Sequence, residues 1–253
     1  MHTNKVKQKL RRGELVVGSF NYIPSARLAE IMALIGFDFV VIDQEHGPMG
    51  SETAEDMVRA CEAQGTTPLV RVSHNTDYIV LQALDMGAQG VHIPNVSTRE
   101  QALEALSYTK YAPLGKRGLA GVRAAEYGFR EKLVDYCARA NEEILTVVHI
   151  EDIEAVNNIE QLLGVEGIDV YYLGPTDLSQ SMNLPGQTGH PDVVKAVEGC
   201  IERIVGMGKV AGVITVEPEA ARRYVKMGVR YLATHALRFM VDASRTFLKS
   251  LGR

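Results

Sequence analysis

The chain has 253 residues, 46% of them hydrophobic, and a net charge of −4 with a pI near 6.0. This length permits one large domain or two small ones. The acidic balance offers no basic face for nucleic acid, and no apolar run approaches the roughly 18 residues that a membrane span requires. The charged start, MHTNKVKQKLRRGELV, lacks the apolar core of a signal peptide. We therefore expect a cytoplasmic chain without a nucleic-acid or membrane partner.

Short β-rich runs alternate with segments of helical periodicity along the chain. The eight β-rich runs are residues 15–20, 37–43, 67–73, 89–95, 144–151, 169–175, 209–215 and 230–236. The helical segments between them include 24–36, 51–65, 98–109, 154–164 and 217–228, and several end in Gly, as a helix C-cap would. This alternation predicts parallel βαβ units. Eight such units in a chain of this length predict an α/β fold, a single (β/α)8 TIM barrel over residues 1–253.

A doubly wound open sheet is the alternative fold. This fold is less favoured, because its most characteristic phosphate-binding motifs are absent. No GxGxxG follows the first strand, and the sequence contains no GxxxxGK[ST]. The longest interval between predicted strands separates the fourth from the fifth and includes YAPLGKRGLAGVRAAEYG, residues 111–128, which we expect over the barrel mouth. Cys61, Cys137 and Cys200 form no CxxC pair, so we expect small core residues.

Polar side chains gather where four of the predicted strands end. They are Asp43, Gln44, Glu45 and His46 on the second strand, Arg71 on the third, His149 and Glu151 on the fifth, and Asp177 on the sixth. Any one of them can be explained as a helix cap, a partner of a helix dipole or half of a surface ion pair. Their common position is harder to explain in that way, because the chemistry of such barrels takes place at the carboxyl ends of the strands. The pattern predicts an active site there.

Two carboxylates from adjacent strands, without cysteine, suit a hard divalent cation such as Mg²⁺ or Mn²⁺. Glu151 and Asp177 are the candidate ligands. A cation held there can bind a 2-oxo acid and stabilise the enolate formed beside it, with Arg71 adding charge at the same oxygen. Schiff-base chemistry needs a lysine inside the barrel, and no strand end carries one, since Lys209 lies at the start of its strand.

The histidines divide into one candidate base and several without an expected role. An imidazole has an unperturbed pKa near 6.5, which suits proton transfer close to neutral pH, and a carboxylate partner fixes its tautomer. His46 is the candidate base and Asp43 its orienting partner. We expect four others in loops or filling space, namely His2, His74, His190 and His235, whereas His92 is either a core residue or part of the site wall.

Six segments together resemble the class II pyruvate aldolases of the 4-hydroxy-2-oxoheptane-1,7-dioate aldolase and 2-dehydro-3-deoxyglucarate aldolase family. They are VIDQEHGPMG, PLVRV, ALDMGAQGVHIPNV, YAPLGKRGLAGVRAAEYG, HIEDIEAVNNI and YYLGPTDLSQSMNLPG. The resemblance covers roughly residues 5 to 235, and the combination of DxEH, RGxxxxRA and GPxDLS is highly specific.

The resemblance implies a (β/α)8 barrel with a divalent metal, Mg²⁺, Mn²⁺ or Co²⁺, on Glu151 and Asp177. It implies His46 as general base supported by Asp43, and Arg71 on the oxo group of the substrate. By the same resemblance Gly174, Pro175 and Thr176 shape a carboxylate pocket, and Asp85 reaches the site of a neighbouring subunit. Members of the family are commonly hexamers, so a homo-oligomer, a hexamer or trimer of dimers, is expected.

Two departures from the family pattern stand out. His149 occupies the position, two residues before the metal glutamate, where the family usually has Gln. The last strand is followed by ATHALRF, where many members carry a Ser-Asp pair. A histidine at 149 points to the same face as Glu151, so we expect it near the metal, either as a ligand or as a hydrogen-bond partner.

The sequence predicts a metal-dependent lyase that reversibly cleaves a 4-hydroxy-2-oxo acid to pyruvate and an aldehyde. One alternative is an oxaloacetate decarboxylase or a CoA-ester lyase of the same superfamily. Another is a barrel that binds 2-oxo acids without turning them over, against which an intact His46 and Asp43 argue.

Overall fold

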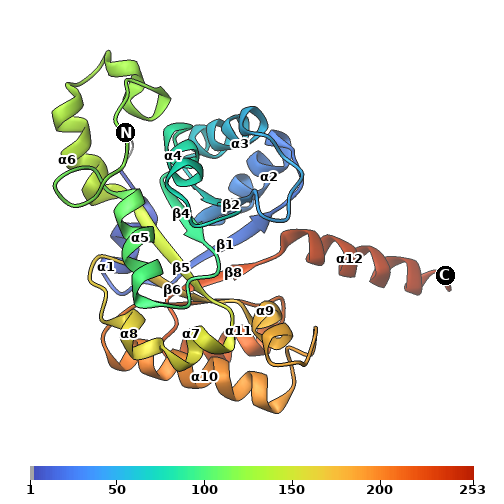
Figure 1. Ribbon diagram of the computed structural model, residues 1–253. Helices are drawn as coiled ribbons and strands as arrows, with labels where there is room; N and C mark the ends of the chain where they lie inside the picture. Colours follow the sequence, from blue (N-terminus) through green and yellow to red (C-terminus); the bar gives the residue numbers. More distant parts are fainter. Residues whose placement is uncertain (1–2) are drawn as a thin grey trace.

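A computed structural model describes residues 3–253 as a closed barrel of eight parallel strands surrounded by helices (Figure 1). The strands are β1 (Val16–Asn21), β2 (Phe39–Asp43), β3 (Thr67–Arg71), β4 (Gly90–Ile93), β5 (Leu145–Ile150), β6 (Val170–Leu173), β7 (Ala211–Ile214) and β8 (Tyr231–Thr234). Each strand pairs with the next along the chain, and β8 returns to β1. The predicted (β/α)8 barrel is therefore confirmed. His2, for which the sequence predicts no role, lies outside the described residues.

The helices lie outside the strands, and most of them follow a strand and pack around the barrel. They are α1 (Lys5–Arg11), α2 (Ala26–Ile35), α3 (Ser51–Ala63), α4 (Asp77–Asp85), α5 (Arg99–Thr109), η1 (Arg123–Gly128), α6 (Leu133–Glu143), α7 (Ile153–Asn157), α8 (Ile159–Leu163), α9 (Pro175–Ser181), α10 (Pro191–Gly206), α11 (Pro218–Lys226) and α12 (Ala236–Ser250). Within residues 3–253, no helix is long and apolar enough to cross a bilayer.

The barrel interior is a packed apolar core, separate from the larger apolar layer between strands and helices. Phe39 on β2 and Tyr231 on β8 stack inside it, with ring centroids 4.3 Å apart. Gly18 lies on β1 between these two strands, where a Cβ atom would come within 2.2 Å of the Phe39 ring. Glycine at this position therefore leaves the space that the aromatic pair occupies.

The first helix closes the barrel at the amino ends of its strands. Val6 and Leu10 of α1 belong to the interior core. Asn4 donates its side-chain amide to the carbonyl of Gln89, 2.8 Å away, and the Lys7 ammonium donates to the carbonyl of Ile144 at 2.8 Å. Gln89 and Ile144 directly precede β4 and β5. The amino end is thus filled by the chain itself, and the carboxyl end is left for a site.

The arginine-bearing segment 111–128 does not lie over the barrel mouth, so that expectation is wrong. Arg117 pairs with Asp85 at 2.9 Å, and Arg123 donates to the Met86 carbonyl at 2.9 Å. Asp85 and Met86 end α4, on the side of the barrel where the strands begin. The reason is electrostatic, because the carbonyl ends of helices attract cationic side chains. Within its own chain Asp85 is occupied by Arg117, and its role at a neighbouring site stays a prediction.

The cysteines and remaining loop histidines lie largely as expected. Cys61 and Cys200 are buried, Cys137 is partly buried, and all three are free thiols. His74 is exposed in the loop after β3. His190 precedes α10, where its ring accepts a hydrogen bond from the backbone N–H of Asp192.

Candidate active site

A cavity of about 360 Å³ opens at the carboxyl ends of the strands. Its lining residues are Phe20, Tyr22, Asp43, His46, Arg71, His149, Glu151, Tyr172, Gly174, Thr176, Asp177, Ile214 and His235. The structure thus brings together eight of the ten residues that the sequence singles out. The other two do not line the cavity, since Pro175 is buried at the start of α9 and Asp85 lies at the amino end of the barrel.

Arg71 is the buried cation of this cavity. Asp43 and Arg71 are directly paired in register on β2 and β3. The guanidinium Nε donates to Asp43 Oδ1 at 2.8 Å, Nη2 donates to the second oxygen, and Nη1 lies 2.9 Å from Glu45 Oε2. Burial by itself raises the pKa of Asp43, but the hydrogen bonds and charge of Arg71 outweigh it and hold that pKa below its usual value. Two of the five guanidinium N–H groups remain for a ligand.

His46 stands at the rim of the cavity, and Asp43 does not hold its ring. Instead Asp43 Oδ1 accepts the backbone N–H groups of Glu45 at 3.1 Å and His46 at 3.3 Å. The carboxylate nearest to the imidazole is that of Glu45, whose Oε2 is 4.0 Å from Nε2. The expected side-chain contact between Asp43 and His46 is therefore wrong, because Arg71 takes the carboxylate. Asp43 supports His46 by fixing the backbone turn that presents it.

Glu151 is buried with both carboxylate oxygens in use. Oε1 accepts the backbone N–H of Asn95 at 2.8 Å, and Oε2 lies 3.0 Å from Nδ1 of His149. A Cβ atom on Gly174 would come within 2.9 Å of Oε2, so only glycine allows the end of β6 to approach so closely. Burial raises the pKa of Glu151, yet its contacts with His149 and Asn95 bring the pKa below the usual value. Glu151 is accordingly held as an anion.

Asp177 lines the same cavity as Glu151. Burial raises the pKa of Asp177, and the negative charge of Glu151 raises it further. In the described part of the chain, no three side chains of the His, Cys, Asp or Glu type are placed to hold a metal ion together. Two mutually repelling carboxylates, with the remaining positions open, are the donor set of a hard cation that keeps water and substrate as ligands. The residues present fit such a cation.

His149 lies beside Glu151, as the alternation of side chains along β5 predicts. Its Nδ1 contacts Glu151, and its Nε2 is 2.9 Å from Nδ1 of His92. Both ring nitrogens are therefore occupied by protein partners. This geometry favours a hydrogen-bond partner of Glu151 over a metal ligand. His92 is a core residue, fully buried, and does not line the cavity.

Five further side chains complete the cavity wall and were missed by the sequence interpretation. They are Phe20, Tyr22, Tyr172, Ile214 and His235. Tyr172 pairs in register with His149, so the period-two pattern of β6 contained the signal for it. His235, expected only to fill space, follows β8 and lines the cavity, which corrects that expectation. Within residues 3–253 the buried hydroxyl of Tyr172 finds no hydrogen-bond partner and is available to a ligand.

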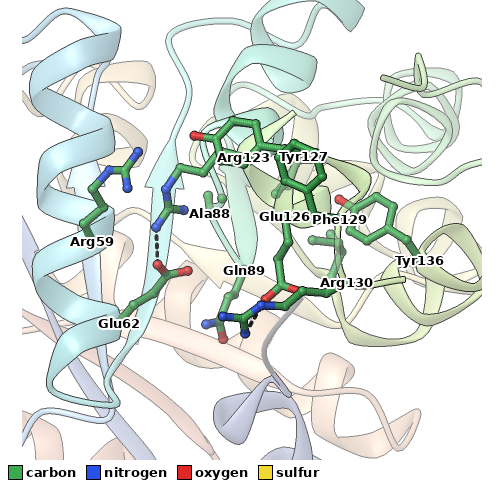
Figure 2. Close-up of a pocket in the computed structure, with 14 residues that line it drawn as sticks. Arg59, Glu62, Ala88, Gln89, Arg123, Glu126, Tyr127, Phe129, Arg130 and Tyr136 are labelled. Atoms are coloured by element: carbon green, nitrogen blue, oxygen red, sulfur yellow. Dashed lines mark hydrogen bonds and ion pairs between the residues drawn. The ribbon is translucent and has the colours of Figure 1, made fainter. Parts of the chain in front are cut away.

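A second cavity, of about 340 Å³, lies beside the ends of α3 and α4 and the η1 segment (Figure 2). It contains three arginines, but each is paired with a carboxylate. Arg123 reaches Glu62, as Figure 2 shows, and also donates to Met86. The other two pairs are Arg59 with Glu55 and Arg130 with Glu126. Because each of these arginines already has a carboxylate partner, the residues that line this cavity do not mark it as an anion-binding site.

The fold and the first cavity define a class of protein. A (β/α)8 barrel with a buried arginine, two carboxylates and a histidine around one cavity at its carboxyl mouth has the arrangement of an enzyme active site. Comparison with known proteins is more specific. The profile of the HpcH/HpaI aldolase/citrate lyase family matches residues 17–235. The chain belongs to this family and is an enzyme of the aldolase and lyase class.

The similarity extends over nearly the whole chain. A 2-keto-3-deoxy-L-rhamnonate aldolase of Salmonella gallinarum is 36% identical over 233 residues, which are 91% of this chain and 86% of that protein. The crystal structure of an HpcH/HpaI aldolase/citrate lyase family protein from Burkholderia cenocepacia has a TM-score of 0.93 at 32% identity and covers 99% of this chain and 100% of that one. The citrate synthase SbnG superposes with a TM-score of 0.86 at 33% identity, covering 97% and 98%.

Proposed function

We propose that this enzyme is a metal-dependent aldolase that cleaves a 4-hydroxy-2-oxo acid to pyruvate and an aldehyde, and that runs in reverse as an aldol addition. The observation that carries the proposal is the convergence of Arg71, Glu151 and Asp177 on one cavity with His46 at its rim. A 2-oxo acid and its enolate are anions, which the Arg71 guanidinium can stabilise directly and which a divalent cation held by the two carboxylates would stabilise as well. The likeness to a 2-keto-3-deoxy-L-rhamnonate aldolase supports the same substrate class.

The residues of the chain divide the work of cleavage. His46 takes the proton from the 4-hydroxyl group, the C3–C4 bond breaks, and the aldehyde leaves. The electron pair of that bond passes to the oxo oxygen and gives the enolate of pyruvate. Arg71 lies where its remaining N–H groups can stabilise this oxygen, and its double pairing with Asp43 and Glu45 holds the guanidinium in place. The proton that His46 has taken then passes to C3 of the enolate, directly or through water, which gives pyruvate and restores the neutral base.

We propose Glu151 and Asp177 as the protein ligands of a divalent cation, Mg²⁺, Mn²⁺ or Co²⁺. When bound, such an ion supplies Lewis-acid stabilisation of the negative charge that develops on the 2-oxo group. Thr176 and Gly174 line the cavity beside Asp177, and we assign the substrate carboxylate to this part of the wall.

The test is pyruvate release from a panel of 4-hydroxy-2-oxo acids that differ in the aldehyde half. Activity should vanish on chelation and return with Mg²⁺, Mn²⁺ or Co²⁺. Borohydride added with pyruvate should leave the protein mass unchanged, because no lysine lines the cavity. A pyruvate adduct on lysine would overturn the mechanism, and a panel without any pyruvate release would overturn the substrate class.

Citrate formation is a second candidate function, favoured by the likeness to the citrate synthase SbnG. Both reactions place a carbanion equivalent next to a carbonyl group and need an oxyanion site. Assays of citrate formation from oxaloacetate and an acetyl-CoA ester, of oxaloacetate decarboxylation and of CoA-ester cleavage, run beside the pyruvate panel, distinguish these functions. Activity confined to those substrates would replace the aldolase proposal.

We further propose a homo-oligomer in which α12 packs on a second copy of the chain. Helix α12 leaves the barrel and projects away from it (Figure 1), and none of its residues is buried. Met240 and Phe247 on α12, and Leu251 at its C-cap, recur at helical spacing and are exposed. The eighth helix of a (β/α)8 barrel normally covers its own strands. An identical chain offers the surface that α12 leaves uncovered, which supports pairing between copies.

Light scattering on the purified protein tests the oligomer. The wild type should have at least twice the 27.8 kDa mass of one chain. The double substitution Met240→Glu and Phe247→Glu should lower that mass, while the exposed polar pair Lys249→Glu and Arg245→Glu on the same helix serves as the control. A monomeric wild type contradicts the proposal.

A further inference from the structure

Four buried polar side chains form a continuous hydrogen-bonded chain through the barrel core. Tyr231 on β8 has its hydroxyl oxygen 2.7 Å from Nε2 of His92 on β4. Nδ1 of His92 is 2.9 Å from Nε2 of His149 on β5, and Nδ1 of His149 is 3.0 Å from Oε2 of Glu151. This chain of hydrogen bonds begins deep in the apolar interior, where Tyr231 and His92 lie away from the cavity wall. It ends at His149 and Glu151, which line the cavity.

The direction of these hydrogen bonds follows from the first member. Among the side chains of residues 3–253, the Tyr231 hydroxyl is hydrogen-bonded to His92. Burial raises the pKa of this phenol well above its usual value, so the hydroxyl keeps its proton. A phenol whose partner is a ring nitrogen satisfies its proton by donating it. Nε2 of His92 is therefore an acceptor.

The remaining protons follow by elimination. A neutral imidazole that accepts at one nitrogen donates at the other, so His92 donates from Nδ1 to Nε2 of His149. His149 then accepts at Nε2 and donates from Nδ1 to the Glu151 carboxylate. Burial lowers the pKa of His92 far below its usual value, which agrees with a neutral ring. Every proton of the chain has an acceptor when both rings are neutral and Glu151 is ionised. A reversed chain leaves the buried phenol proton without an acceptor.

We propose that Tyr231, His92 and His149 are positioning residues that form a one-way hydrogen-bond chain and fix the orientation of the Glu151 carboxylate. The Asn95 N–H holds the other oxygen, so the plane of the carboxylate is set from both sides. In this direction the Nδ1–H of His149 points at Oε2 of Glu151, so the carboxylate is held by donors and its other lone pairs stay available to a cation. The proposal rests on the assignment of Glu151 as a metal ligand only for its effect on affinity, and the arrangement of protons is independent of it.

The arrangement of protons is tested by ¹⁵N NMR of the imidazoles in the metal-free protein. Two buried histidines should appear as neutral tautomers with the proton on Nδ1, and Tyr231→Phe, which removes the first donor, should change both signals. Tyr171→Phe is the matched control. Tyr171 is an equally buried phenol on β6, but it donates to the carbonyls of Leu162 and Val165 outside the barrel. A proton on Nε2 of His149, or a doubly protonated ring, would overturn the proposal.

The positioning effect is tested by Mn²⁺ binding, measured from the electron paramagnetic resonance signal of the free ion. Loss of a direct partner of a metal ligand costs about 10-fold or more in affinity. Tyr231 acts on Glu151 through two imidazoles, so Tyr231→Phe should weaken Mn²⁺ binding measurably, by up to about that 10-fold. Tyr171→Phe should bind as the wild type does. Equal affinities in all three proteins would refute the positioning role. A wild type that binds no divalent ion would instead refute the metal site of the proposed function. The NMR result alone would then show whether the hydrogen-bond chain exists.

Discussion

His46 and Asp43 lie three residues apart and do different work. Asp43 is buried and paired with Arg71, whereas the His46 side chain is 61% exposed at the rim of the cavity. The sequence placed both at one strand end, but it could not show which neighbour the carboxylate would choose. Asp43 pairs with Arg71 because the guanidinium offers two charged hydrogen-bond donors on the adjacent strand, in direct register. The imidazole is left free to meet a substrate.

Replacement of His46 tests its role as the base. His46→Ala should lower turnover by about 10²-fold to 10⁴-fold, the usual effect of losing a positioned acid or base. Pyruvate affinity should be retained, because the Arg71 and carboxylate side of the cavity is unchanged. His74→Ala, in an exposed loop, is the control for steady-state kinetics. Turnover close to that of the wild type would show that another group takes the proton.

The Asp43–Arg71 pair makes stability depend on pH in a stated direction. The pKa of Asp43 is lowered in the folded state, so its contribution is complete above the unfolded pKa of about 3.9 and is lost as the pH falls through the folded value. Asp43→Asn leaves a buried guanidinium half unpaired, which typically costs about 3 to 5 kcal/mol at neutral pH. Urea unfolding at pH 7 and pH 3 should show the difference between wild type and variant shrinking in acid.

The unfolding experiment on Asp43→Asn has a matched control and an outcome that would contradict the prediction. Glu14→Gln changes an exposed carboxylate that pairs with Arg12 at the surface and should unfold as the wild type does at both pH values. A variant–wild type difference that is the same at pH 7 and pH 3 would mean that ionisation of Asp43 does not contribute to stability.

At the scale of elements, the strands and the position of polar residues at their ends were predicted correctly from the sequence. All eight strands follow the predicted runs, because a buried parallel strand is a short apolar segment bounded by helical periodicity. The alternation along β5 placed His149 beside Glu151 correctly. Segment 111–128 was misplaced, since Gly-rich composition says that a segment is a loop but not which end of the barrel its arginines will reach.

The junction of β6 and α9 gives a prediction about backbone approach. Gly174→Ala would bring a Cβ atom against the Glu151 carboxylate, 2.9 Å from Oε2, in a site where Asn95 and His149 leave the carboxylate no room to turn. We expect activity and Mn²⁺ affinity to fall by about 10-fold or more, as when a ligand is pushed from its place. Isothermal titration with Mn²⁺ and circular dichroism separate this loss from misfolding.

Gly199→Ala is the matched control, because its added methyl group meets open space on α10. This change should leave Mn²⁺ affinity as it is and slightly raise stability, since alanine favours a helix by about 0.5 to 1 kcal/mol over glycine. Unchanged Mn²⁺ affinity in Gly174→Ala would mean that Glu151 moves freely or is not a ligand.

At the scale of the whole molecule, the family and barrel followed from motifs spread over the chain, whereas several long-range contacts did not. His92 shows the difference. The sequence left it as a core residue or a wall residue, because nothing local tells that Tyr231, 139 positions later, will supply its hydrogen bond. The same holds for Arg117 and Asp85, and for the exposed α12, whose partner surface is not found within the described part of its own chain.

The position of α1, which closes the amino end of the barrel, also has a consequence for the order in which the chain folds. Helix α1 has seven residues, too few to be stable alone in water. Its anchoring contacts join Asn4 to Gln89 and Lys7 to Ile144 and Asp169, across 85, 137 and 162 positions. During synthesis, the first helix to leave the ribosome therefore waits until β6 has emerged before its docking surface exists. The earliest segment of the chain is among the last to be secured.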